Sequence, residues 1–240
     1  MDFYIILFII ALLYSAVGHG GASGYLALMA LYGIAPEVMK PTALMLNIFV
    51  SLTAFVQYYR GGHFNLKMFL PLANASIPMA FIGGTIPIHD LIYKKILGFL
   101  LLIPVIKFLF YKNIKDEALK PYNFALCLVI GGSIGFISGM IGIGGGIILS
   151  PVLLFLNWTN QKQAAAISAL FIFVNSVAGL AGQFTKGIHF TESMATYVLI
   201  ALVGGLCGAY LGALKFNQNI LKKLLGVVLL FAAVKLIMGG

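Results

Sequence analysis

Long apolar runs follow one another along almost the whole chain, from Asp2 to Met238. Most have about the 20 residues that an α-helix needs to cross the hydrocarbon core of a bilayer. The one markedly polar stretch of ten residues is KNIKDEALKP, at 112–121. This pattern predicts an all-α integral membrane protein in which a polar loop at 112–121 joins two membrane-embedded parts, residues 1–111 and 122–240.

Each part is predicted to contain a long first segment followed by three simpler spans. The simpler spans are expected at 42–59, 65–88, 93–111, 164–184, 192–214 and 220–238. Each long segment has two apolar pieces separated by glycines, and these pieces lie at 3–17 and 22–33, and at 122–141 and 147–158. Together, two such pieces exceed one bilayer crossing at about 1.5 Å per residue. Each long segment is therefore either a glycine-broken long helix or a re-entrant hairpin.

The two parts resemble each other in sequence. At an offset of 126, QYYRGGHFN (57–65) aligns with QFTKGIHFT (183–191), and the same offset places Gly18 and Gly20 on Gly144 and Gly146. At an offset of 128, KKILGFLLLIPVIK aligns with KKLLGVVLLFAAVK, with seven of fourteen residues identical. Internal similarity at a fixed spacing indicates repeated structural units. We therefore expect two homologous membrane repeats joined at the polar loop.

The distribution of positive charge favours one topology of these repeats. Cytoplasmic loops of membrane proteins are enriched in Lys and Arg. Four crossings per half would divide the fifteen Lys and Arg residues 8 to 7 between the two sides, whereas three crossings and a re-entrant hairpin per half would divide them 10 to 5. The clearer bias of the second arrangement favours inverted repeats with both termini outside the cytoplasm.

Composition narrows the class further. The chain is 61% hydrophobic and 9% charged, with a mean hydropathy of +1.05, which excludes an ordinary soluble domain of this size. The net charge of +9 comes from lysines at the ends of apolar runs, where anionic lipid explains them without a nucleic-acid partner. Cys127 and Cys207 each lie inside an apolar run, which predicts small core residues rather than a disulfide or a zinc site.

The stretch GMIGIGGGIILSP, at 139–151, admits three interpretations. A nucleotide-binding loop would need a lysine for the phosphates, and this stretch has none. Glycines spaced by four allow close helix packing in lipid, and this interpretation suits Gly131, Gly135 and Gly139, and also Gly204, Gly208 and Gly212. Consecutive glycines disfavour a helix, so Gly142 and Gly144 to Gly146 predict a helix break.

A helix break at membrane depth predicts an anion site. The restarted helix presents unpaired N–H groups and the positive end of its dipole, and inverted repeats bring two such ends together near the bilayer midplane. The expected substrate-binding residues lie at the two breaks and in the span after each: Gly18, His19, Gly20, Gly21, Ser23, Asn47, Gly144, Gly145, Gly146, Ile147, Asn175 and Ser176. His19 is either a structural hydrogen-bonding residue or a group that carries charge or a coupled proton.

Other chemistry finds little support in the sequence. All six acidic residues lie near the N-terminus or in predicted loops, so no carboxylate within the membrane is available to bind a cation. No nucleophile–base pair or metal-ligand cluster is recognisable. We therefore expect a protein that is not an enzyme and that needs neither a cofactor nor a metal.

The motifs GHGGASG (18–24) and GIGGGIILSP (142–151), followed by NIFVS (47–51) and NSVAG (175–179), resemble those of the sulfite exporter TauE/SafE family of bacterial and archaeal membrane proteins. The likeness covers nearly the whole chain. In the first half His19 replaces a glycine, and Tyr25 stands where alignment with Pro151 would predict proline.

The resemblance implies a multi-pass secondary transporter in the cell membrane of a prokaryote, which moves sulfite or organosulfur anions such as sulfonates by alternating access. An anion channel of the same fold is the alternative. The expected partners are a small anion and membrane lipid. The direction of transport, proton coupling and homodimer formation stay open.

Overall fold

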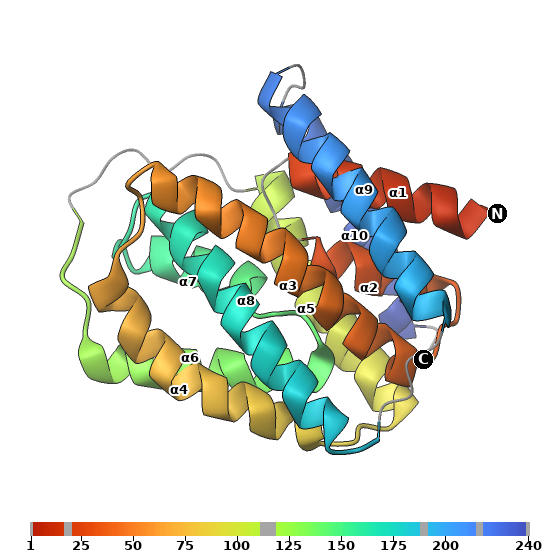
Figure 1. The fold of residues 1–240 in the computed structure, drawn as a ribbon, viewed down its shortest axis with the longest axis horizontal. Coiled ribbons are helices and arrows are strands. Elements are labelled where there is room, and N and C mark those ends of the chain that lie inside the picture. The colour runs from red at the N-terminus through yellow and green to blue at the C-terminus, as the bar shows by residue number, and fades with distance from the viewer. Residues whose placement is uncertain (1, 17–20, 111–118, 188–191, 215–217, 239–240) are drawn as a thin grey trace.

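The structure is a computed structural model that describes residues 2–16, 21–110, 119–187, 192–214 and 218–238 (Figure 1). Over these residues the chain forms ten α-helices and no strand. In chain order they are α1 (Asp2–Ala16), α2 (Ala22–Leu31), α3 (Pro36–Arg60), α4 (Leu66–Thr85), α5 (Asp90–Phe110), α6 (Phe124–Ile141), α7 (Gly146–Phe155), α8 (Gln161–Phe184), α9 (Glu192–Leu214) and α10 (Gln218–Met238). The predicted all-α fold is confirmed, and a separate helix corresponds to each predicted apolar piece.

Two of the helices that begin earlier than the apolar pattern predicts have a clear signal at their start. α3 starts at Pro36 rather than at residue 42, because Pro36 occupies the first turn, where its missing N–H group has no intrahelical partner to lose. α8 starts at Gln161 rather than at residue 164. There the Asn160 side chain accepts from the backbone N–H of Gln163, whose own side chain accepts from the backbone of Asn160, and this capping box fixes the start of the helix.

The helices of the two parts pack against one another in a reciprocal pattern. The first helix of each part lies along the fourth helix of the other, so that α1 packs on α9 and α6 packs on α4. The third helices, α3 and α8, pack on each other and run side by side through the middle of the molecule (Figure 1). The fifth helices, α5 and α10, also form a pair. Exchanging the two parts therefore leaves these main contacts unchanged.

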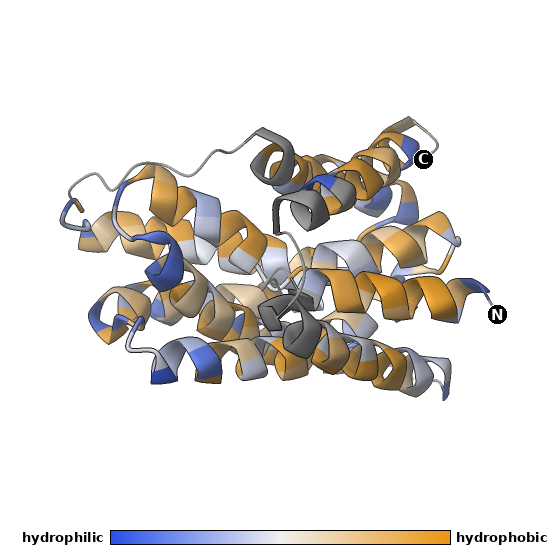
Figure 2. Ribbon diagram, turned by 90° about the horizontal axis from the view of Figure 1, so that it is seen from above, coloured by the Kyte–Doolittle hydropathy of each residue, from blue (hydrophilic) through white to orange (hydrophobic). Residues whose placement is uncertain are grey.

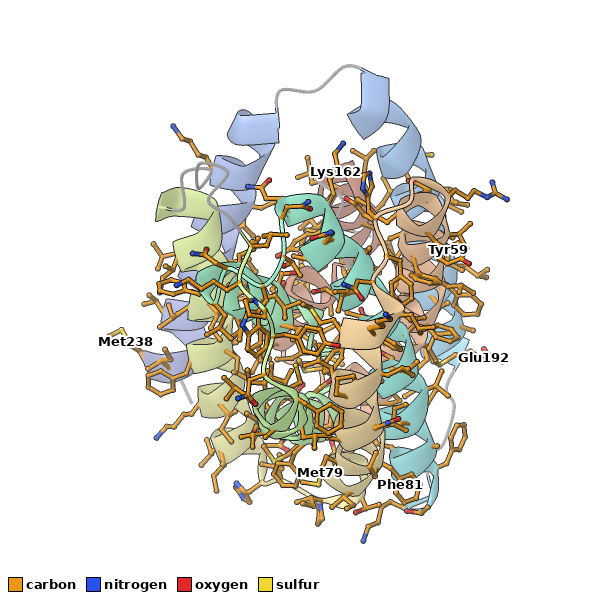
Figure 3. All side chains as sticks on the ribbon, turned by 90° about the vertical axis from the view of Figure 1, so that its left-hand side faces the viewer. Tyr59, Met79, Phe81, Lys162, Glu192 and Met238 are labelled. Carbon is orange, nitrogen blue, oxygen red and sulfur yellow. The ribbon has the colours of Figure 1, made fainter. Side chains whose placement is uncertain are left out.

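The outer surface suits a lipid environment. Among the described residues, α3, α4, α6 and α8 are long and apolar enough to cross a bilayer. Large apolar side chains such as Phe99, Val129 and Phe231 are more than half exposed, and hydrophobic residues cover the outer helices while hydrophilic ones gather near helix ends and loops (Figure 2). Phe81 of α4 is also exposed, whereas Met79 of the same helix lies against Gly132 of α6 (Figure 3). Such extensive apolar exposure is rare in a soluble monomer, and the chain is a multi-pass membrane protein.

Glycines spaced by four bring α6 and α4 into close contact, as the sequence predicts. A Cβ atom on Gly131, Gly135 or Gly139 would overlap the backbone of α4, at Leu72, Ser76 and Ala80 respectively. Gly204 and Gly208 of α9 face the backbone of α1 in the same way. The side chains around Gly212 lie outside the described residues. Small residues thus set the separation of both reciprocal helix pairs.

The close contact predicts that one added methyl group destabilises the protein at one glycine of α6 and is accommodated at another, two turns away. Gly139→Ala forces the backbones of α6 and α4 apart and lowers the free energy of unfolding by about 1–3 kcal/mol. Gly132→Ala is the matched control, because its Cβ would lie 3.7 Å from Ala75 Cβ, an ordinary contact. Thermal unfolding in detergent measures both variants, and equal midpoints for the two would contradict this packing.

Candidate functional site

Two helices of ten residues, α2 and α7, start directly after a glycine in the left-handed conformation. Gly21 (φ 72°) precedes α2, and Gly145 (φ 79°) precedes α7. This backbone conformation strongly favours glycine. Neither helix start has a side-chain cap. The predicted break in the second half is confirmed, because α6 ends at Ile141 and the chain passes through Gly142, also left-handed at φ 90°, before α7 begins.

The two short helices correspond at an offset of 124 rather than 126. At this offset the residues that follow them, Gly33 (φ 71°) and Asn157 (φ 55°), also coincide, and both have a positive φ. Pro151 therefore corresponds to Ala27 and not to Tyr25. The sequence alignment of the glycine clusters is wrong by two residues, because the loops that flank the short helices differ in length between the halves.

The loop between α6 and α7 leaves several backbone donors unused. The Gly142 amide donates to the Ser138 carbonyl at 2.8 Å, and the Leu149 amide donates to the Gly145 carbonyl at 3.0 Å. Between these two bonds, the described part of the chain offers no acceptor to the amides of 144–147. These N–H groups lie at the positive end of the α7 dipole.

Side chains from α3 and α8 meet this loop. A Cβ atom on Gly144 would lie 2.7 Å from Asn47 Nδ2 and 3.1 Å from Ser176 Oγ. Gly144 therefore needs glycine for two reasons, its φ of 79° and the close approach of these two side chains. Asn47, Gly144 and Ser176, three of the predicted site residues, are thus brought together from α3, the loop and α8.

Several polar atoms around the loop are fully buried and have no hydrogen-bond partner among the described residues. They are both side-chain atoms of Asn47 (Nδ2 and Oδ1), Ser176 Oγ, Asn175 Oδ1 and Ser138 Oγ. Ser138 lies beside the loop, since a Cβ on Gly145 would be 3.3 Å from its Cβ. Each unpaired buried polar group costs about 1–3 kcal/mol, so a concentration of them at one place needs partners from outside the described residues, such as water or a polar ligand.

Unpaired polar atoms are also found further along the chain, at Gln183 Nε2 and Thr159 Oγ1. Gln183 is seven residues beyond Ser176 on α8, about 10 Å along the helix axis. Thr159 precedes α8, seventeen residues before Ser176. Neither belongs to the cluster around Gly144.

The other predicted residues of the second half line the same region. Gly146 packs on α8, where a Cβ would lie 3.0 Å from the Ser168 carbonyl and would overlap Ile172. Ile147 packs against the large apolar core cluster. Asn175 is oriented by its own helix, because its Nδ2 donates to the Phe171 carbonyl at 2.8 Å and leaves Oδ1 unpaired.

The first half of the predicted site is described only in part. Gly18, His19 and Gly20 lie outside the described residues. Ser23 Oγ is 3.0 Å from the hydroxyl oxygen of Tyr14. The Ser23 hydroxyl therefore already has a hydrogen-bond partner in the first half. Gly21 is packed against the ring of Tyr25.

One apolar cluster joins the two helix restarts. It contains Tyr25 and Leu26 of α2, Leu46 of α3 and Ile143 of the second loop. Both restarts therefore contribute to one apolar core, but α2 and α7 do not form one of the main helix pairs, and among the described residues no polar contact joins them.

The sequence pattern did not identify two residues near the loop. Ser138 is seven residues before Gly145, and nothing in the sequence distinguishes it from any other serine in an apolar helix. The backbone of Lys40 lies against Gly142, where a Cβ would be 3.1 Å from Lys40 Cα. A signal for Lys40 was present, because it stands seven residues before Asn47, two turns along the same face of a helix.

The site offers both donors and acceptors. The loop amides and Asn47 Nδ2 donate, Asn47 Oδ1 and Asn175 Oδ1 accept, and the hydroxyls of Ser138 and Ser176 can do either. The contacts at the loop include no carboxylate. Within the described segments no three His, Cys, Asp or Glu residues are grouped closely enough to bind a metal ion.

Apolar helices of bilayer length, together with a buried polar site between helices from both parts of the chain, define a multi-pass membrane protein of the transporter class. The chain belongs to the sulfite exporter TauE/SafE family, whose model matches residues 3–236.

The relatives of the chain carry transporter names. It is 34% identical to the probable membrane transporter protein y4hK of Sinorhizobium fredii over 235 residues, which cover 96% of this chain and 95% of the relative. It is 30% identical to the probable membrane transporter protein MJ0441 of Methanocaldococcus jannaschii, covering 92% and 88% of the two chains. The probable membrane transporter protein YdhB of Bacillus subtilis is 27% identical, with 89% of each chain covered. No solved structure matches the chain significantly.

Two glycines with the same backbone strain test the close approach at the loop. Gly144→Ala adds a methyl group that displaces Asn47 and Ile172, whereas Gly33→Ala adds one to open space, and both glycines have positive φ. In each variant, we expect the left-handed backbone to lower the free energy of unfolding by about 1 kcal/mol, because alanine disfavours this conformation. In Gly144→Ala, overpacking lowers the free energy of unfolding by about 1–3 kcal/mol more. Thermal unfolding compares them, and a Gly144→Ala midpoint as high as that of Gly33→Ala would argue against the convergence of α3 on this loop.

Proposed function

We propose that this protein is a secondary transporter of small oxyanions, which bind where the N-terminus of α7 meets Asn47 and Ser176. The observation that carries this proposal is the cluster of buried polar groups without partners around Gly144, together with the unpaired amides of the loop. A bound oxyanion accepts hydrogen bonds from the loop amides, from Asn47 Nδ2 and from the Ser176 hydroxyl, and so removes the energetic penalty of each unpaired donor.

The sign of the ligand charge follows from the same groups. The N-terminus of an α-helix carries a partial charge of about +0.5, which favours an anion. Asn47 and Ser176 add neutral donors, and the nearest charged residue along α3 is Lys40. Acceptors are present as well, at Asn47 Oδ1 and Asn175 Oδ1, so the preference for an anion rests on the loop amides, the helix terminus and the lack of a carboxylate among the loop contacts.

Sulfite and sulfonates are the substrates that we favour, as the description of the family suggests. Both present three oxygen atoms that point in different directions around one sulfur. The donors also come from different directions, namely the loop, α3 and α8. Ile172 lies against the same loop and offers an apolar wall for the organic part of a sulfonate.

Alternating access of two inverted halves is the mechanism that fits the position of this site. Asn47 belongs to the first half, Gly144 and Ser176 belong to the second, and α3 and α8 pack on each other between them. A movement of one half against the other therefore changes the site directly. The unequal division of Lys and Arg, 10 to 5, supports the inverted orientation. The organisms of the relatives support insertion in the cell membrane of a prokaryote.

The remaining predicted residues complete this proposal. Gly18, His19, Gly20, Gly21 and Ser23 form the opposing half of the site, and His19 is the residue through which proton coupling would act. The full burial of Asn47, Asn175 and Ser176 supports a carrier in an occluded state more than an open channel.

Counterflow in proteoliposomes tests the carrier mechanism. We expect saturable uptake of radiolabelled sulfite that accelerates when the vesicles are preloaded with unlabelled sulfite or sulfonate. A flux that neither saturates nor shows counterflow would indicate a channel instead. Absence of specific movement of sulfite, alkylsulfonates and related anions would overturn the proposed function.

A charge placed inside the donor cluster tests the site. Asn47→Asp keeps the size of the side chain but sets a buried carboxylate against the anion, and we expect a loss of uptake of about tenfold or more. Asn123→Asp is the matched control, because this exposed residue caps α6 and aspartate also caps helices well. Unfolding midpoints verify that both variants are folded, and full uptake by Asn47→Asp would remove Asn47 from the site.

A further inference from the structure

Lys40 lies at the edge of the proposed site with its positive charge unpaired. It is in the second turn of α3 and only partly buried. Its Nζ atom is 4.8 Å from the centroid of the Tyr93 ring, and no ion pair involving Lys40 occurs within the described ranges. A cation–π contact compensates only partly for the removal of an ammonium group from water.

Tyr93 links this lysine to the loop. Tyr93 is fully buried in α5, and its hydroxyl donates to the carbonyl of Ile141, the last residue of α6, at 3.0 Å. The next residue, Gly142, lies against the backbone of Lys40. The aromatic ring therefore holds the ammonium group close to the point where the chain leaves α6 and enters the loop.

Lys40 and the proposed anion site lie on one face of α3. Gly142 faces Lys40 and Gly144 faces Asn47, so the loop follows α3 over two turns. Seven residues of α-helix span about 10 Å. The ammonium group over Tyr93 lies at the Lys40 end of this stretch, so its charge acts on an anion at Gly144 from on the order of 10 Å.

Acidic groups do not neutralise this lysine by direct contact. Glu37 and Asp90 act on Lys40 electrostatically, but both are exposed and neither forms an ion pair with it. Solvent and salt screen exposed carboxylates more strongly than a charge between packed helices. The positive field of Lys40 is therefore available on the side of the loop.

We propose that Lys40 supplies the fixed positive charge of the anion site and that Tyr93 positions it. This inference rests on the proposed function and names a charged binding residue for the same site. At an effective dielectric constant of about 20, a unit charge about 10 Å away changes the affinity for a monovalent anion by about tenfold. The change is larger for a dianion.

Neutralisation of Lys40 gives the decisive test. Lys40→Met keeps the length of the side chain and removes its charge, Lys40→Arg keeps the charge, and Lys95→Met is the matched control on an exposed lysine of α5. The measurements are the concentration dependence of uptake and of thermal stabilisation, each with methanesulfonate as the monoanion and sulfoacetate as the dianion.

We expect Lys40→Met to raise the KM for methanesulfonate about tenfold, and that for sulfoacetate by more, with little change in maximal rate. The KM of Lys40→Arg stays within about twofold of that of the unmodified protein, and the KM of Lys95→Met does not change. An unaltered KM in Lys40→Met would overturn the assignment, and so would a rise of KM in Lys40→Arg as large as that in Lys40→Met. If the unmodified protein shows neither uptake nor anion-dependent stabilisation, the proposed function itself fails.

Tyr93→Phe separates the ring from the hydroxyl. The variant keeps the aromatic face under the ammonium group and loses the hydrogen bond to Ile141. We expect a lower unfolding midpoint with KM within about twofold, whereas Tyr93→Leu, which also removes the ring, raises KM. A KM in Tyr93→Leu equal to that of Tyr93→Phe would overturn the positioning role of the ring.

Discussion

Backbone N–H groups at membrane depth must find partners inside the protein, and this requirement governs the structure around α7. The chain ends α6 at Ile141, passes through two further left-handed glycines after Gly142, and restarts as α7. The amides of 144–147 are left without acceptors among the described residues. A broken helix of this kind is tolerated in a membrane only where protein or a polar cavity surrounds it. Here α3 and α8 surround it, and the polar groups that they contribute are themselves unpaired.

Glycine serves two distinct purposes in this chain, and the structure separates them. In α6, Gly131, Gly135 and Gly139 keep regular helical geometry and let the backbone of α4 approach. In the loop, Gly144 and Gly145 adopt positive φ and also lie in contact with side chains of neighbouring helices. The first group fixes the distance between halves, because α6 and α4 belong to different halves. The second group opens the backbone at the place where those halves meet.

Much of the fold could be predicted from the sequence because bilayer-length apolar runs and consecutive glycines are strong local signals. The helix breaks and the meeting of Asn47, Gly144 and Ser176 fall where these signals put them. The register of the two short helices could not be predicted, because it depends on loop lengths that differ between the halves. The role of Ser138 at the loop needed the tertiary contact with Gly145, which leaves no local trace in the sequence.

We propose that an oxyanion completes the hydrogen bonds of the α6–α7 loop. Selenite has the shape of sulfite, and its selenium scatters anomalously, so diffraction from crystals grown with selenite locates it directly. We expect a selenium peak between the start of α7 and Asn47, with selenite oxygens about 3 Å from Asn47 Nδ2 and from the amides that follow Gly144. A fully occupied selenite elsewhere in the membrane region, with Asn47 and Ser176 bonded only to protein groups, would contradict it.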